Sequence, residues 1–557
     1  MPILNFTKRV FRSYSYVDWI LTSFGIILVL LMVLKMMVFP YGFGLFSSTN
    51  IYTEAIVSKT GFQNINPLYV DYNEADREVS RLVFSGLMKY DIDSRRVVED
   101  MGLLTISEDK KEYTLTLKDG LKWQDGQNLT IDDVYFTYHD IIMDERFPNQ
   151  ILKANFSGVG LQLVGNSVKF TLEKPNSFFI SNLVYGILPK HILNGVDPAS
   201  LLEHSFNKFP VGSGPYAMKE PLESFVDGRM QVNLKENEYY YGPSSDVEVL
   251  RIIAFEDMEI LFEDLNSINA IVKVTGWNIS EFENNDRFSI LSYELPQYIA
   301  VFMNMESEFL RSDGVRLALQ KSIDKTKLLD EFVDKKPVDT PLMQLDQENW
   351  EYKTNIGEAM GSLKDAGFSY AEDDTEKSGF RFNDGKALEL KLITRSYPQG
   401  GQQYVETQKI IAFLQLAWKD IGVNLLVEFY DMDEFEDKIM QRDYDLLLVG
   451  QSLGYNLDTY SYWHSTQATP TGQNFSNYKS FAVDTLIEDI RGLFDEEKRQ
   501  EKLNALATQI REDFPAIFLY RPVYYYVTDG KILGLNMEGV VFPSDRYANI
   551  ANWKFDK

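Results

Sequence analysis

The sequence predicts an α/β protein of more than one domain, preceded by one transmembrane helix. One long apolar run stands near the N-terminus, and short strand patterns alternate with amphipathic helix patterns after it. The chain has 557 residues, which exceeds what one ordinary hydrophobic core organises. Hydrophobic residues make up 45% of it, enough to bury large cores, which is typical of a folded chain and not of a disordered one.

The first predicted element is a membrane anchor at residues 19–39, which we expect to be followed by a linker at 40–50. The run contains one charged residue, Lys35, and about 20 apolar residues suffice for a helix to cross a bilayer. Lys8, Arg9 and Arg12 precede it. By the positive-inside rule, residues 1–18 are cytoplasmic and the C-terminal body is extracytoplasmic.

A cleaved signal peptide is the alternative for the same run. Its apolar region is about 7–15 residues long and ends in a small-residue cleavage site. This run is longer, and residues 41–50 (YGFGLFSSTN) offer no such site. An uncleaved single-pass anchor in the cell membrane is therefore the prediction.

The first half of the remaining chain shows separate strand and helix signals. Residues 113–117 (YTLTL) and 168–172 (VKFTL) alternate with a period of two, as half-buried strands do. Thr130 followed by Asp133 has the spacing of a helix N-cap with an acid at the third helical position. Ser312 is placed to cap a helix that contains Val315.

Residues 388–449 predict a strand–helix–strand–helix–strand unit. The expected strands are 388–394, 423–429 and 444–449, and the expected helices are 404–420 and 432–441. This order implies parallel strands with right-handed crossovers. Ligands bind beyond the carboxyl ends of such strands, which points to Thr394–Tyr397 and Gly450–Asn456.

Composition excludes several classes of function. The net charge is −27, whereas a nucleic-acid-binding protein needs a basic surface. The chain has no cysteine, which removes disulfides, thiolate metal ligands and a cysteine nucleophile. No two of its four histidines have zinc-ligand spacing. We expect no cofactor, no metal and no catalytic residue.

A series of motifs resembles a known family. The series comprises residues 66–69 (NPLY), 82–90 (LVFSGLMKY), 113–141, 168–193, 211–216 (VGSGPY), 236–242 (ENEYYYG), 298–325 and 514–520 (FPAIFLY). Its order is similar to that of the family 5 bacterial extracellular solute-binding proteins, the peptide- and nickel-binding group. The resemblance covers nearly all of 51–557.

The resemblance implies the two-lobed fold of large type II periplasmic binding proteins, which close over a ligand. Lobe I would take residues 51–292 and 516–557, with an extra subdomain at about 95–205, and lobe II would take 293–515. The implied function is capture of oligopeptides for the permease subunits of an ABC importer, without catalysis. Many relatives use a lipid-anchored cysteine, which this chain lacks.

Candidate ligand-binding residues combine apolar walls, hydrogen-bonding groups and one cation. In peptide binders of this family an Asp follows the strand equivalent to 444–449 and pairs with the peptide's amino group. Gly454 stands at that position, and Asp458 is the nearest acid after it. The candidates are Trp277, Met303, Asn304, Arg395, Tyr397, Gln451, Ser452, Tyr455, Asn456, Asp458 and Trp463.

Two short motifs suggest other chemistry. Gly450-Gln-Ser-Leu-Gly454 matches the nucleophile elbow of α/β-hydrolases, but His464 is the only downstream histidine and lies too close in sequence for a triad. Gly212-Ser-Gly-Pro-Tyr-Ala217 fits a dinucleotide fingerprint only superficially, and we expect a tight turn at a lobe crossing.

Two further functions remain open at this stage. The same fold can bind a non-peptide solute such as an oligosaccharide, a metal chelate or haem, or it can serve as an envelope sensor without a permease.

Overall fold

The computed structural model describes residues 15–16, 50–371, 379–455 and 457–556. The predicted anchor at 19–39, the linker up to residue 49 and the candidate Asn456 lie outside the described residues. Within the described ranges, no helix has both the length and the apolar character needed to cross a membrane. Residues 51–557 form one compact unit.

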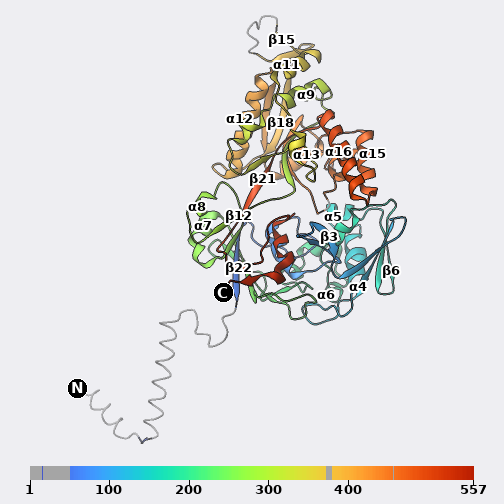
Figure 1. Cartoon of the computed structure of the whole chain (residues 1–557), viewed down its shortest axis with the longest axis vertical. Helices are drawn as coiled ribbons and strands as arrows, with labels where there is room; N and C mark the ends of the chain where they lie inside the picture. Colours follow the sequence, from blue (N-terminus) through green and yellow to red (C-terminus); the bar gives the residue numbers. More distant parts are fainter. Residues whose placement is uncertain (1–14, 17–49, 372–378, 456, 557) are drawn as a thin grey trace, which may run out of the picture. The chain divides into compact units, whose positions relative to one another are not determined.

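A mixed β-sheet runs through this unit and joins two lobes (Figure 1). In spatial order its main path is β19 (Asn424–Tyr430), β18 (Glu389–Arg395), β20 (Leu446–Ser452), β13 (Gln297–Met303), β21 (Ala516–Thr528), β11 (Ala270–Val274), β1 (Ile51–Val57), β10 (Val249–Phe255), β9 (Arg229–Glu236) and β8 (Tyr216–Met218). Two further strands, β12 (Ser289–Glu294) and β14 (Lys335–Pro337), pair with β21.

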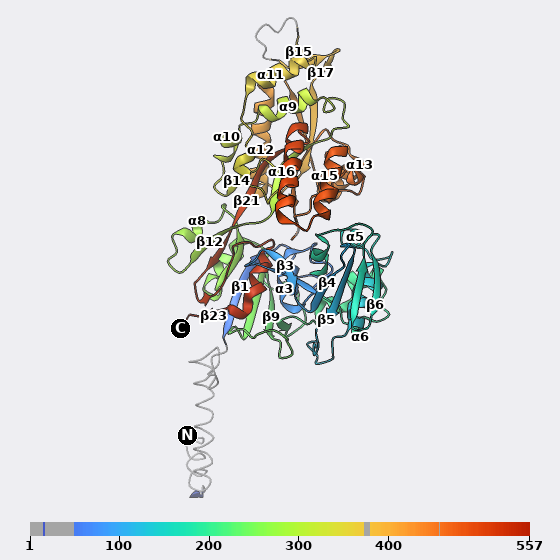
Figure 2. The ribbon, with the colours of Figure 1, turned by 45° about the vertical axis from the view of Figure 1, so that its right-hand side comes forward.

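The long strand β21 belongs to both lobes. Its first half pairs with β13 and β14, and its second half, from Val523 to Thr528, pairs with β12. Figure 2 shows it passing from one lobe into the other. We therefore define lobe I as residues 51–294 and 523–557, and lobe II as 297–522. The predicted lobe boundary at 515/516 lies at the start of β21. The strands that pair with β21 change between Pro522 and Val523, so the observed boundary lies within the strand.

Lobe II contains the predicted strand–helix unit. Strands β18 and β19 are parallel, as are β18 and β20, and α12 (Gln402–Lys419) and α13 (Met432–Gln441) connect them, so the parallel arrangement is confirmed. Gly422 ends the α12 turn with a φ of +86°, which a side chain would disfavour. The remaining helices of this lobe are α9 (Asp313–Lys321), α10 (Lys325–Leu329), α11 (Ile356–Asp365), α14 (Tyr460–Trp463), α15 (Phe481–Gly492) and α16 (Glu496–Asp513).

Strand β13 carries apolar residues on both faces because helices cover the lobe II sheet on both sides. Val301 and Met303 pack into one buried cluster with Trp418, whereas Tyr298 and Phe302 pack into another on the opposite face. Such double burial is typical of a central strand.

Lobe I holds the rest of the sheet and a separate antiparallel sheet of β4 (Gly102–Ile106), β5 (Glu112–Leu117), β7 (Ser167–Thr171) and β6 (Gly160–Val164). This second sheet lies within the predicted subdomain region. The predicted strands at 113–117 and 168–172 correspond to β5 and β7. Thr130 caps α4 (Ile131–Tyr135) in a capping box with Asp133, as its spacing predicts.

Helix α3 (Glu74–Val83) is the lobe I element that matters most for the site. Asn73 caps its N-terminus, accepting a hydrogen bond from the amide of Ala75. At its other end Gly212 and Gly214 approach the backbone closely, since a Cβ on Gly214 would lie 2.4 Å from the Leu82 carbonyl oxygen. The predicted turn at 212–217 therefore packs against α3 within lobe I, not at a lobe crossing.

Other lobe I elements complete the fold. The helices are α5 (Gln150–Ala154), α6 (Lys190–Leu193), α7 (Met258–Glu263) and α8 (Ser280–Glu283), and the small strand pairs are β2 (Met88–Asp91) with β3 (Arg96–Glu99) and β22 (Ile532–Leu533) with β23 (Lys554–Phe555).

Candidate functional site between the lobes

A cavity of about 580 Å³ lies between the two lobes. This volume is in the range of small-molecule sites. Lobe I contributes α3, the segment around residues 181–186 and the C-terminal residues 541–544, and lobe II contributes the segment that follows β20. Leu295 and Gln297, at the crossing between β12 and β13, also line it. The cavity therefore depends on both lobes and on the connection between them.

Tyr455 of lobe II inserts between two aromatic rings of lobe I. Its ring stacks on Tyr90 at a centroid distance of 4.8 Å and meets Phe542 edge-on at 5.1 Å. Its hydroxyl donates to Asp545 Oδ1 at 2.9 Å. Burial, with the nearby Asp545 carboxylate, raises the pKa of Tyr455 well above its ordinary value, so the hydroxyl keeps its proton. One residue thus ties the two lobes together beside the cavity.

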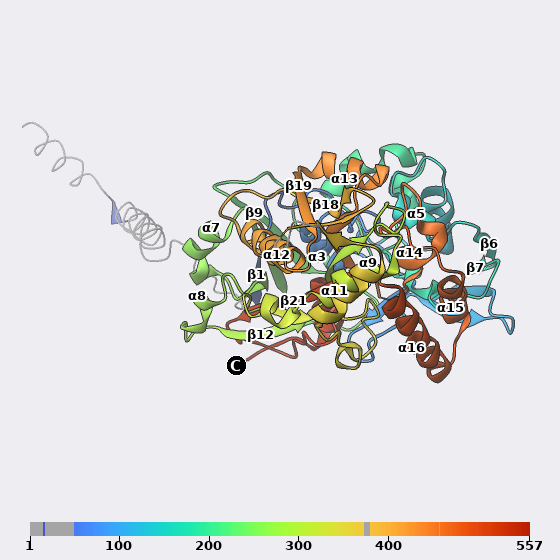
Figure 3. The same ribbon diagram turned by 90° about the horizontal axis from the view of Figure 1, so that it is seen from above.

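A second contact joins the lobe I subdomain to α15 and α16, which Figures 1 and 3 place beside it. Lys174 pairs with Glu488 at 3.0 Å, and the amide of Ser177 donates to the carbonyl of Arg491 at 2.7 Å. Phe178 belongs by sequence to lobe I, but its side chain is buried in a lobe II cluster. The described structure is therefore a closed arrangement of the lobes.

The carboxylates that line the cavity all have cationic partners. Asp71 pairs with Arg77 at 2.6 Å, and Glu74 pairs with Lys273. Asp458 lies 3.1 Å from the Nε of Arg491 and also accepts from the amide of Tyr460. Burial raises the pKa of Asp458, against the opposing effect of Arg491.

Arg81, the remaining cation of the cavity wall, differs from the others. It has no carboxylate oxygen within 4.0 Å among the described residues. Its Nη2 donates to the Tyr90 carbonyl at a long 3.4 Å, and its Nε is buried without a protein partner in the described part of the chain.

The structure brings four predicted binding residues to the cavity: Gln451, Ser452, Tyr455 and Asp458. Gly454 lines it as well. The Gln451 amide is held on both sides, by the Tyr298 hydroxyl and by the carbonyl of Gln473 at 3.2 Å. Among these side chains, Ser452 is exposed.

Three other candidates lie in the core of lobe II. Met303 is fully buried because its face of β13 is covered by helices. Asn304 donates to the Tyr444 carbonyl at 2.9 Å and accepts from the Asn477 side chain, so its amide is used in hydrogen bonds within lobe II. Trp463 packs edge-on against Phe518 at 5.8 Å.

Trp277, Arg395 and Tyr397 lie outside the cavity lining. Trp277 is exposed, and Arg395 stacks over Tyr397 at 5.4 Å. Strand β20 neighbours β13 at the lobe connection, whereas β18 is one strand further out. This difference explains why the segment after β20 reaches the cavity and Thr394–Tyr397 does not.

Sequence reasoning missed the lobe I wall, above all Arg77 and Arg81 of α3. They are four residues apart, which places them on one helix face. This spacing was the sequence signal that the two arginines share a helix face. The tertiary packing decides which face of α3 lines the cavity.

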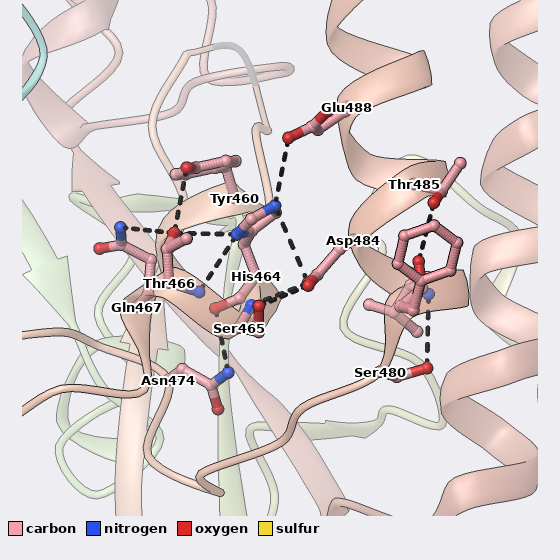
Figure 4. Close-up of polar contacts among 12 residues, drawn as sticks. Tyr460, His464, Ser465, Thr466, Gln467, Asn474, Ser480, Asp484, Thr485 and Glu488 are labelled. Atoms are coloured by element: carbon pink, nitrogen blue, oxygen red, sulfur yellow. Dashed lines mark hydrogen bonds and ion pairs between the residues drawn. The ribbon is translucent and has the colours of Figure 1, made fainter.

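Ser452 does not stand at a nucleophile elbow. It ends strand β20 in regular pairing with Gln297, without the strained strand-to-helix turn of a hydrolase. Figure 4 shows His464 engaged elsewhere: its Nδ1 lies 2.8 Å from the Thr466 hydroxyl, and its Nε2 faces Asp484 and Glu488 at 3.8 and 3.7 Å. No hydrogen bond joins Ser452 to His464 in the described part of the chain.

Within the described residues, no group of three or more His, Asp or Glu side chains is arranged to hold a metal ion. The polar groups of the cavity are suited to hydrogen bonds and ion pairs instead.

Two lobes, a chain that passes between them at the β12–β13 connection and within β21, and a cavity lined by both lobes define a two-lobed solute-binding protein. The chain belongs to the bacterial extracellular solute-binding proteins of family 5, whose middle-region pattern matches residues 96–473. Known members of this kind are binding proteins and not enzymes.

Individual relatives agree with this assignment. The chain is 26% identical over 515 residues to the oligopeptide-binding protein AppA of Bacillus subtilis, covering 88% of this chain and 89% of that protein. The structure of that AppA with a nonapeptide superposes with a TM-score of 0.71 at 23% identity, covering 91% of this chain and all of the other. NikZ of Campylobacter jejuni in complex with Ni(L-His) also gives 0.71, at 26% identity over 91% of this chain and 99% of NikZ.

Proposed function

We propose that this protein is a membrane-anchored extracytoplasmic receptor that captures oligopeptides by lobe closure and delivers them to the permease subunits of an ABC importer. The observation that carries the proposal is the cavity between the lobes, with wall residues from both. Because the wall is complete only in the closed arrangement, a bound ligand would favour closure by contacting both lobes at once.

The peptide part of the proposal draws on the relatives. The AppA protein of B. subtilis is named as an oligopeptide-binding protein. The cavity supplies what a short peptide needs: amide and hydroxyl groups from Gln297 and Ser452, and apolar walls from Phe84 and Phe475.

The location is proposed from the sequence. Residues 19–39 have the length and apolarity of one membrane span, and the basic residues before it favour a cytoplasmic N-terminus. A membrane tether would keep the receptor beside its permease.

A small non-peptide solute is the second candidate, because a volume of about 580 Å³ also fits a chelate or another compact ligand. NikZ, a relative of similar fold, was solved with Ni(L-His).

The test is to purify the full chain in detergent, denature it and analyse the released small molecules by mass spectrometry. Peptides of mixed sequence would support the proposal. A single non-peptide ligand would favour the second candidate. An empty protein that binds no member of a peptide library would refute the peptide assignment.

A further inference from the structure

Arg81 differs from the other charged residues that line the cavity in how its side chain is paired. Cavity carboxylates come from Asp71, Glu74 and Asp458, and each already has a cationic partner: Arg77, Lys273 and Arg491 respectively. A ligand's amino group that enters the cavity therefore meets no unpaired acid among the described residues, and it would have to break an existing pair to gain one.

Arg81 is in the opposite position. Its guanidinium carries five N–H donors and stays charged at any physiological pH. Among the described residues these donors have one protein acceptor, the Tyr90 carbonyl at 3.4 Å, and Nε is buried without a partner. A buried donor without an acceptor costs free energy, which an incoming acceptor removes.

The acids near Arg81 favour its charged form but make no direct ion pair with it. Asp545 accepts from the amides of Val541 and Phe542, at 3.0 and 2.8 Å, and from Tyr455. Asp100 accepts from the Tyr241 hydroxyl at 2.7 Å. Neither forms an ion pair with Arg81 within 4.0 Å in the described part of the chain.

The packing of α3 holds Arg81 at the wall. Arg77, one turn earlier on the same face, is fixed by Asp71 and by the ring of Phe542, 4.1 Å from its guanidinium carbon. Gly214 packs against the end of the helix, its amide donating to the Val83 carbonyl at 2.8 Å. The helix therefore presents two guanidinium groups to the cavity. Arg77 is ion-paired with Asp71, and Arg81 has no ion pair within 4.0 Å among the described residues.

We propose that the cavity selects a ligand by its carboxylate, which Arg81 binds, and makes no use of a free amino group. This inference rests on the proposed function in that the cavity is the solute site, and it names the chemistry of the solute. A planar guanidinium recognises a carboxylate through two parallel hydrogen bonds, which adds geometric selectivity to the attraction of charge.

The test uses the full chain in detergent and three matched pools of random di- to pentapeptides: unmodified, N-acetylated and C-amidated. A fourth pool contains small mono- and dicarboxylates with their amides. Affinities are compared by native mass spectrometry and calorimetry for wild type, Arg81→Gln, Arg81→Lys and the control Arg96→Gln. Arg96 is exposed on β3 of the same lobe, outside the cavity lining.

We expect wild type and Arg96→Gln to bind unmodified and N-acetylated peptides alike, and C-amidated peptides about 10- to 100-fold more weakly. Arg81→Gln should lose this discrimination, because its side chain carries no positive charge for the carboxylate. Arg81→Lys should retain part of it, because the charge remains and the two-pronged geometry is lost.

Each other outcome is decisive. Equal binding of all three peptide pools would refute the carboxylate inference and leave peptide binding intact. Carboxylates that bind through Arg81 while no peptide binds would support the inference and refute the peptide assignment. Discrimination that survives in Arg81→Gln, or no binding in any pool, would overturn the inference.

Discussion

The hydrogen bond between Tyr455 and Asp545 crosses from lobe II to lobe I, so its removal should shift the balance between the closed and open arrangements. The change Tyr455→Phe keeps the ring contacts with Tyr90 and Phe542 and removes only the hydroxyl that donates to Asp545 at 2.9 Å. A hydrogen bond to a charged group contributes about 1.5–3 kcal/mol. The ratio of closed to open molecules should therefore fall about 10- to 150-fold.

The absence of cysteine makes this shift directly measurable. Spin labels on Asp119→Cys of lobe I and Glu497→Cys of lobe II, both exposed positions, report the distance between the lobes. In the ligand-free protein, Tyr455→Phe should broaden and lengthen the distance distribution relative to wild type.

The matched control is Tyr352→Phe. Its hydroxyl donates to the Arg511 carbonyl at 3.0 Å, entirely within lobe II, so its loss should leave the distances unchanged. A Tyr455→Phe protein with the same closed fraction as wild type would refute the role assigned to this hydrogen bond.

Three other predictions concern buried groups. Phe178→Ala should shift the balance toward the open arrangement by about 1.5–3 kcal/mol, because this lobe I ring is buried in a lobe II cluster; an unchanged label distance would contradict this. Arg546→Met should lower the free energy of unfolding in urea by about 3–5 kcal/mol, since it leaves Glu54 and Glu78, each 2.6 Å from the guanidinium, buried and unpaired. Adding Glu54→Gln and Glu78→Gln should restore most of that loss, and no recovery would argue against the charge explanation. Burial raises the pKa of Glu78 from 4.5 to about 7. Its contribution of about 3 kcal/mol to the free energy of unfolding is therefore present below pH 4.5 and is lost as the pH rises through 7. Glu78→Gln should remove this part of the pH dependence of stability, and an identical pH profile would show that Glu78 is not its source.

The predicted lobe II elements match the structure closely because their signals are local. The helix predicted at 432–441 is α13, and the strand predicted at 423–429 is β19 within one residue at each end. A buried strand needs an apolar run, and an amphipathic helix needs apolar residues three or four apart, whatever the rest of the chain does. Only neighbouring residues are required to read such patterns.

The site was harder to predict because a wall is made by elements that are distant in sequence. The rule that ligands bind beyond the carboxyl ends of parallel strands correctly selected Gln451 to Tyr455, which line the cavity. It also selected Arg395, which does not, because its strand β18 lies one position further from the lobe connection than β20. Met303 and Trp463 looked like apolar walls, but they are core residues. Apolar cores and apolar pockets use the same residue types, so sequence alone does not separate them.

The sequence by itself determined the α/β class, the parallel unit of lobe II and the family, since each depends on local periodicity or on the order of motifs along the chain. Tertiary structure decided which of the candidate residues line the cavity and which lobe I residues join them. It set Tyr455 between two rings of lobe I, paired each cavity carboxylate with a cation and left Arg81 without one. Such pairings depend on distances of a few ångströms between residues up to hundreds of positions apart, which only the packed chain fixes.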